Sequence, residues 1–158
     1  MGVEIERKFL VLELGFLDEV ETLATPMRQG YLTPQGAGVA VRVRLEGHRA
    51  VLTVKGPGGA GGMTRAEFEY EVPWEDAVGM LGLCVGGLVE KTRYAIEIDG
   101  LTWEVDVFEG ENLGLAIAEV ELEREDQEIA QPEWLGEEVT GDPRYYNASL
   151  ARSPWSGW

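Results

Sequence analysis

Residues 3–11 read VEIERKFLV, and this stretch decides the fold of the chain. In a β-strand, side chains at alternate positions share one face. Glu4, Glu6 and Lys8 therefore point to one side, while apolar side chains occupy the other. Two carboxylates two residues apart could hold a divalent cation, and a neighbouring lysine could bind phosphate oxygens. Taken alone, however, the stretch is more typical of an ordinary strand with one solvated, charged face.

The same alternation recurs along the chain, which changes this interpretation. In nearly every case the positions between the charged residues are apolar, so the predicted strands are apolar on one face and charged, with mixed sign, on the other. A charged face repeated over several strands favours a functional surface. The pairs are Arg42 and Arg44, Glu67 and Glu69, Lys91 and Arg93, Glu104 and Asp106, and Glu119 and Glu121, with Lys55 at the end of a further segment, LTVK.

The pattern predicts an α+β fold that is mostly antiparallel β, in a single domain over residues 1–158. The 21 glycines punctuate short alternating segments, as is typical of strands joined by tight turns such as Asp99-Gly100. Expected strands cover residues 2–12, 28–33, 38–46, 49–55, 64–72, 90–99, 101–108 and 115–125. Expected helices cover residues 16–23, 74–83 and 143–152.

Two arrangements satisfy such strands. An open sheet could bury its apolar face and leave its charges in water. Alternatively, eight strands could close into a tunnel with the charges inside and a few helices packed outside, leaving a bore wide enough for one small ligand. Buried charges need compensating partners, which a bound metal ion, a bound anion and mutual salt bridges would supply. We favour the closed tunnel, with a polyphosphate and a divalent ion as its contents.

The composition excludes several other classes of protein. A formal charge of −16, from 29 acidic and 13 basic residues, argues against nucleic acid or an anionic membrane as partner. The apolar runs are too short to cross a bilayer and no signal peptide is recognised, so a cytoplasmic protein is expected. One cysteine, Cys84, and one histidine, His48, make a disulfide, a zinc site or a Cys- or His-based nucleophile implausible.

The motifs together resemble those of the CYTH superfamily, also called triphosphate tunnel metalloenzymes. The resemblance spans residues 3 to about 151 and implies an eight-stranded antiparallel tunnel. Members hydrolyse inorganic triphosphate, thiamine triphosphate or nucleoside triphosphates, and some bacterial members make cyclic AMP. The matching motifs are Glu4-x-Glu6-x-Lys8, the Gln-Gly-Tyr-Leu of residues 29–32, Arg42-x-Arg44, Thr53-x-Lys55, Glu67-x-Glu69, Lys91-x-Arg93-Tyr94, Asp106 and Glu119-x-Glu121.

The resemblance also implies a role for each matching residue. The metal ligands for Mg²⁺ or Mn²⁺ would be Glu4, Glu6, Asp106 and Glu121. Lys8, Tyr31 and Glu119 would act near the reacting phosphate or position water. The triphosphate would be bound by Arg42, Arg44, Lys55, Lys91 and Arg93, with Arg65, Glu67 and Glu69 in supporting positions.

The function that the resemblance implies first is metal-dependent hydrolysis of inorganic triphosphate, as in the short bacterial members. A class IV type adenylate cyclase that makes cyclic AMP from ATP is the first alternative, and hydrolysis of thiamine or nucleoside triphosphates is a variant. A noncatalytic polyphosphate-binding module is less compatible with so many carboxylates. The expected partner is a small-molecule triphosphate, and the sequence leaves a homodimer open.

Overall fold

The computed structural model describes residues 5–20, 22–57 and 66–158. Within these residues nine strands form one antiparallel sheet in the order β5-β4-β3-β2-β6-β7-β8-β1-β9. The strands are β1 (Ile5–Val11), β2 (Ala24–Tyr31), β3 (Ala40–Glu46), β4 (Arg49–Lys55), β5 (Glu67–Glu71), β6 (Val85–Ile98), β7 (Leu101–Phe108), β8 (Ala116–Leu122) and β9 (Leu135–Glu138). The helices of the same residues are α1 (Trp74–Leu81) and α2 (Asn147–Arg152), with 3₁₀ turns η1 (Gly15–Asp18), η2 (Gly110–Asn112), η3 (Pro143–Tyr145) and η4 (Trp155–Gly157).

The predicted α+β class is confirmed, and a strand lies at each of the eight expected places, although β2 begins four residues and β6 five residues earlier than expected. The helices differ in part. The segment expected to be helical over 16–23 forms only the short turn η1. The helix expected over 143–152 divides into η3 and α2 because Tyr146 between them has extended backbone dihedrals, φ −70° and ψ 140°. The strand β9 was missed because its four residues, LGEE, show no clear alternation.

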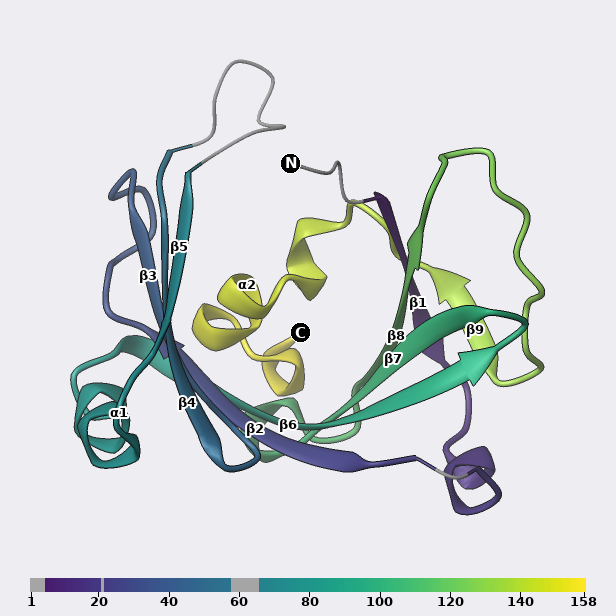
Figure 1. Ribbon diagram of the computed structural model, residues 1–158, viewed down its shortest axis with the longest axis horizontal. Coiled ribbons are helices and arrows are strands. Elements are labelled where there is room, and N and C mark those ends of the chain that lie inside the picture. Colours follow the sequence, from purple (N-terminus) through teal and green to yellow (C-terminus); the bar gives the residue numbers. More distant parts are fainter. Residues whose placement is uncertain (1–4, 21, 58–65) are drawn as a thin grey trace.

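The closed eight-stranded tunnel is not what the structure shows, because the sheet is open with β5 and β9 at its two edges. Closing the eight expected strands would require β5 to pair with the free edge of β1. That edge is taken by β9, which pairs with β1 from Phe9 to Val11. The sheet is instead bent into a deep U, with β3, β4 and β5 in one wall, β1, β7 and β8 in the other, and β2 and β6 at the base (Figure 1).

The two faces of this sheet differ as the alternation predicts. One apolar cluster lies on the convex face around Phe9, Trp103 and Val120 and is covered by η1 and the segment that includes Trp134. A second convex cluster, around Val43, packs beneath α1. The charged side chains consequently line the concave face.

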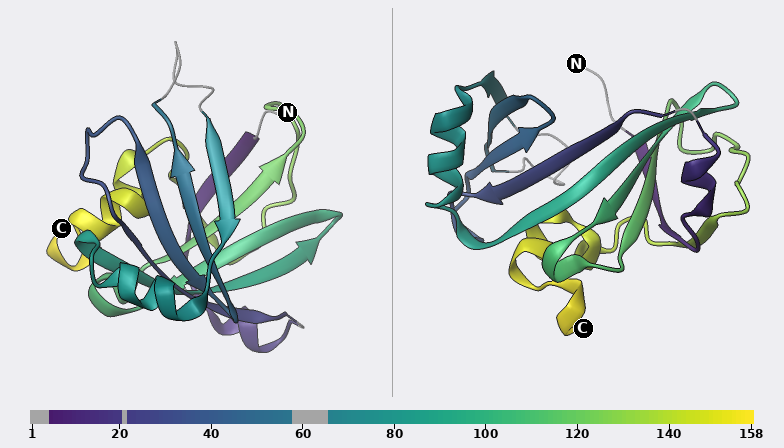
Figure 2. Two further views of the ribbon diagram at one scale, coloured as in Figure 1. Left: turned by 60° about the vertical axis from the view of Figure 1, so that its left-hand side comes forward. Right: turned by 90° about the horizontal axis from the view of Figure 1, so that it is seen from below.

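The helix α2 does not lie outside the sheet as expected but packs against the concave face. Its buried Leu150 and Ala151 contact Val89 and Phe108, which share the concave face with the charged residues. The two views of Figure 2 show the same arrangement, with α1 on the outer side of the sheet and the C-terminal segment at one end of the U. None of the helices in the described part of the chain is long and apolar enough to span a membrane.

The contact between α2 and the sheet gives a stability prediction. Replacing the fully buried Leu150 by Ala removes the main anchor of α2, so we expect the free energy of unfolding to fall by about 2–5 kcal/mol. Leu83→Ala is the matched control, because Leu83 is 73% exposed and should change stability by less than about 0.5 kcal/mol. Urea denaturation of both variants measures the difference; equal losses would mean that α2 is not anchored in this way.

Candidate functional site

Asp106, on β7, lies at the centre of the concave face. It is 7% exposed, and its carboxylate accepts hydrogen bonds from two basic side chains of β6. Lys91 Nζ lies 2.8 Å from Oδ2, while Arg93 binds both oxygens, with Nε 2.8 Å from Oδ1 and Nη2 3.0 Å from Oδ2. The β6–β7 hairpin creates this contact, because its register sets Arg93 directly opposite Asp106. The hairpin turns at Asp99-Gly100, both with positive φ, as a two-residue connection of this kind requires.

The environment of this cluster shifts the pKa of each member. Burial lowers the pKa of Lys91, and Arg93 and Arg44 lower it further; the attraction of Asp106 does not offset these effects, so the pKa is about 8. Burial raises the pKa of Asp106, but Lys91 and Arg93 outweigh that and bring it to about 2. Burial also lowers the pKa of Arg93, yet the hydrogen bonds with Asp106 and the charges of Asp106 and Glu104 raise it on balance. Asp106 therefore stays ionised and keeps two neighbouring cations together.

Two further arginines extend the basic part of the face onto β3. Arg44 Nε donates to Gln29 Oε1 at 2.8 Å, and its Nη1 lies 3.7 Å from Glu46. Burial, followed by the charges of Arg42 and Arg93, lowers the pKa of Arg44 to about 10. Arg42 Nη2 donates to Thr53 Oγ1 at 3.3 Å. Four cations from β3 and β6 are thus gathered on one side of the concave face.

Carboxylates gather on the other wall. Glu6 and Glu121 are directly opposite one another on β1 and β8, and Glu119 lies opposite both Lys8 on β1 and Glu104 on β7. Glu6, Glu104, Glu119 and Glu121 line a common cavity of about 380 Å³. Among the described residues no three acidic, histidine or cysteine side chains are close enough to form a metal-binding group. Glu4, the third carboxylate expected there, lies outside the described residues.

The remaining predicted residues are distributed along the same face. Tyr31 is opposite Arg42, Thr53 is opposite Glu69 and Lys55 is opposite Glu67, which places them on the concave side of β2, β4 and β5. Thr53 Oγ1 donates to Glu69 Oε2 at 3.3 Å, so Glu69 supports the residue that in turn holds Arg42. Arg65 lies outside the described residues.

Four residues of the site were not among the predicted ones. Asn147 accepts a hydrogen bond from Lys91 at 3.0 Å, and the Tyr146 ring lies 5.2 Å from Lys8 Nζ. Both lie in the segment that was expected to be helical over residues 143–152, to which the sequence analysis assigned no role in the site. Glu104 pairs with Arg93 at 2.8 Å, and Gln29 binds Arg44. The alternation of Glu104 with Asp106 and the motif at residues 29–32 were the available signals.

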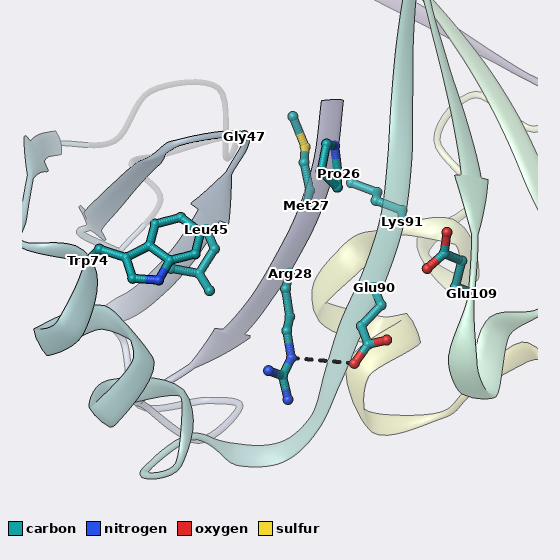
Figure 3. A pocket seen from close by; sticks show the side chains of 9 residues that line it. All are labelled: Pro26, Met27, Arg28, Leu45, Gly47, Trp74, Glu90, Lys91 and Glu109. Atoms are coloured by element: carbon teal, nitrogen blue, oxygen red, sulfur yellow. Dashed lines mark ion pairs between the residues drawn. The ribbon is translucent and has the colours of Figure 1, made fainter. Parts of the chain in front are cut away.

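A second cavity, of about 350 Å³, lies beside α1 and the strands β2 and β6. Its lining is mixed: Trp74 and Leu45 are apolar, and Arg28 forms an ion pair of 3.3 Å with Glu90 (Figure 3). Arg28 and Glu90 lie on the opposite face of the sheet from Arg44 and Arg93, as the strand register shows. Lys91 also lines this cavity, but Arg42, Arg44 and Arg93 do not.

The sheet is open and antiparallel, and its concave face carries cations on one side and carboxylates on the other. This arrangement is typical of proteins that bind an anion together with a metal ion. The sequence comparison makes this class specific, because the family model described as the CYTH domain matches residues 2–152. The chain belongs to the CYTH domain family.

Individual relatives cover nearly the whole chain. The inorganic triphosphatase of Acetivibrio thermocellus is 44% identical over 161 residues, covering 100% of this chain and 99% of that protein. The inorganic triphosphatase of Nitrosomonas europaea is 40% identical over 153 residues, covering 95% and 97%. Among solved structures, the inorganic triphosphatase NE1496 is 38% identical with a TM-score of 0.77, covering 96% of this chain and 95% of that one. A putative adenylate cyclase from Bacillus halodurans, 17% identical with a TM-score of 0.54 and covering 78% and 82%, shares the fold.

Loss of a carboxylate charge should lower the free energy of unfolding more at Asp106 than at an exposed ion pair. Asp106→Asn leaves the buried Lys91 without its anion and Arg93 with Glu104 alone, so the free energy of unfolding should fall by about 3–5 kcal/mol. Glu138→Gln removes the partner of Arg7 from a solvent-accessible ion pair and should lower it by no more than about 1 kcal/mol. Chemical denaturation at neutral pH compares the two; a similar small loss in both would show that Asp106 does not stabilise the cluster.

Proposed function

We propose that this chain, acting as one domain, hydrolyses inorganic triphosphate to phosphate and diphosphate on the concave face of its sheet, with Mg²⁺ or Mn²⁺ as cofactor. The observation that carries the proposal is the gathering of Arg42, Arg44, Lys91 and Arg93 beside a wall of carboxylates. A linear triphosphate needs several cations for its oxygens, and relatives that align over almost the full length are named inorganic triphosphatases.

The basic residues provide binding and alignment. Phosphoryl transfer depends mostly on positioning and on stabilising charge that is spread over oxygens, with little covalent chemistry for the protein to do. Cations that are already held by Asp106, Gln29 and Thr53 lose little orientational freedom when the substrate binds. The triphosphate would lie between the two walls of the U. In this proposal the substrate binds both walls of the open sheet electrostatically. Hydrogen-bond pairing between the edge strands is then not needed to enclose it.

The acidic wall fits a divalent metal ion. Glu6 and Glu121 present carboxylate oxygens from adjacent positions of β1 and β8, and such hard oxygen donors suit Mg²⁺ or Mn²⁺. Glu4, two positions before Glu6 in the sequence, is expected from the alternation to share its face, although it lies outside the described residues. When bound, the ion would neutralise and polarise phosphoryl oxygens.

Residues next to this wall would serve the attacking water. Glu119 lies opposite Lys8 and two residues before Glu121, on the same face of β8. Its carboxylate could therefore accept a hydrogen bond from water beside the terminal phosphoryl group. The ammonium of Lys8 lies beside the aromatic ring of Tyr146, which restricts its position while leaving its charge available to phosphate oxygens. Tyr31, opposite Arg42, would add a hydroxyl donor at the basic end.

Asp106 has a different role in this proposal from the metal ligand that the resemblance implied. Its two oxygens already accept three hydrogen bonds from Lys91 and Arg93. A metal ion there would displace these contacts and add its own positive charge beside the buried Lys91 and the part-buried Arg93. We therefore assign Asp106 to positioning the basic residues and leave metal binding to Glu4, Glu6 and Glu121.

A substrate comparison tests the reaction itself. With Mg²⁺ or Mn²⁺, inorganic triphosphate should be hydrolysed faster than ATP or thiamine triphosphate, and EDTA should abolish turnover because the ion is needed for charge neutralisation. Released phosphate and cyclic AMP are measured separately. Cyclic AMP as the main product from ATP would replace the proposal by a cyclase; binding of triphosphate without turnover of any substrate would indicate a binding module.

Removing one carboxylate tests the acidic wall. Glu6→Gln keeps the size of the side chain but removes a metal-binding charge, so kcat should fall at least about 100-fold with little change in unfolding temperature. Glu138→Gln provides a control, since Glu138 pairs with Arg7 on the other face of β1 and should leave turnover near the wild-type value. Retained activity in Glu6→Gln would show that the metal ion is held elsewhere.

A further inference from the structure

Gln29 is a buried neutral residue within the basic part of the concave face. Its side chain is 0% exposed and lies directly opposite Arg44 on the neighbouring strand. The Arg44 guanidinium donates from Nε to Gln29 Oε1 at 2.8 Å, and this contact fixes the orientation of the amide, because the reverse orientation would set two donors against each other. Gln29 Nε2 is consequently directed away from Arg44.

The Gln29 amide has an unused donor in the ligand-free protein. Among the residues that the structure describes, Nε2 is buried and has no hydrogen-bond partner. Arg42 Nε, on the same face of the adjacent strand, is buried and unpartnered in the same sense. A buried N–H without an acceptor is unfavourable and uncommon in native proteins, so two such groups close together call for an explanation.

The surroundings explain which acceptor is missing. The carboxylates beside the partners of Gln29 and Arg42 are already engaged. Glu46 pairs with Arg44, and Glu69 accepts a hydrogen bond from Thr53, which itself accepts one from Arg42. Phosphoryl oxygens are acceptors only, and a triphosphate brings many of them at once. A neutral amide also suits this position better than another cation, because Arg44 is already repelled by Arg42 and Arg93.

We propose that Gln29 is a further substrate-binding residue, whose amide Nε2 donates a hydrogen bond to a phosphoryl oxygen when triphosphate binds beside Arg42 and Arg44. The inference rests on the proposed function, since it assumes that triphosphate binds this face. Gln29 then has two tasks: Oε1 orients Arg44, and Nε2 contacts the substrate. The ligand-free protein keeps this donor unsatisfied, and binding of the anion completes its hydrogen bonding.

Two variants separate these tasks. Gln29→Glu has the same shape and keeps an acceptor for Arg44, but it has no donor and adds a negative charge. Gln29→Met has similar length and stays neutral, but it has neither donor nor acceptor. The control is Glu46→Gln. It removes the carboxylate that pairs with Arg44 and leaves the Gln29 amide intact. Isothermal titration with inorganic triphosphate in EDTA measures binding without turnover, and thermal unfolding of the ligand-free proteins checks folding.

We expect Gln29→Met to raise the Kd for triphosphate about tenfold, the loss of one hydrogen bond to a charged group, and Gln29→Glu to raise it further. Gln29→Glu should unfold at no lower temperature than the wild type, because its carboxylate still accepts from Arg44. Glu46→Gln should not weaken binding.

Three outcomes would contradict these expectations. If Gln29→Glu and Gln29→Met both bind triphosphate as tightly as the wild type, the inference alone is overturned. Equal weakening in Glu46→Gln and Gln29→Met would also overturn it, since Gln29 would then act only by orienting Arg44. A wild-type protein that neither binds triphosphate in EDTA nor hydrolyses it with Mg²⁺ or Mn²⁺ would overturn the proposed function together with the inference.

Discussion

The contact of Asp106 with Lys91 and Arg93 is the interaction on which the concave face depends. Two cations on alternate positions of one strand repel each other, and burial makes each of them costlier to keep charged. The carboxylate opposite them on β7 offsets both effects and fixes their geometry. The lowered pKa of Lys91 shows that the compensation is incomplete, because Asp106 is shared between two cations and Arg44 adds further repulsion. The site is therefore stable without ligand and still electrostatically suited to an anion.

The position of α2 follows from the same face of the sheet. An amphipathic helix needs an apolar surface, and the concave face provides one at Val89, Phe108 and Ile117, where the charged alternation is interrupted. At its first residue, Asn147, the helix supplies an acceptor to Lys91, so the packing of apolar side chains and the satisfaction of a buried ammonium occur together. The C-terminal segment is thus part of the site as well as part of the core.

The sequence allowed prediction of the strands and of which residues share a face. Successive side chains of a strand point to opposite faces, so an alternation of charged and apolar residues identifies both. Lys91, Arg93 and Asp106 were identified in this way and do lie together. The predicted closure of the sheet was wrong, and its open form could not be foreseen, since the edge strand β9 is only four residues long and lacks the alternation that marks the other strands. The contacts of Asn147 and Gln29 could not be predicted either, because a neutral amide gives no charge pattern and the contact between Asn147 and Lys91 joins positions 56 residues apart.

The order of the strands in the sheet separates the two kinds of charge. Arg42, Arg44, Lys55, Lys91 and Arg93 come from β3, β4 and β6, which lie on one side of the sheet, while Glu6, Glu104, Glu119 and Glu121 come from β1, β7 and β8 on the other. The two sets meet only along the border between β6 and β7, where Asp106 and Glu104 neutralise Arg93. Away from this border, single residues of opposite sign lie beside each set: Glu46 is next to Arg44, and Lys8 is opposite Glu119. Each wall nevertheless keeps a predominant sign of charge. A polyphosphate with a divalent cation has the complementary division of charge, anionic oxygens for one wall and a metal ion for the other, and it can satisfy both walls at once.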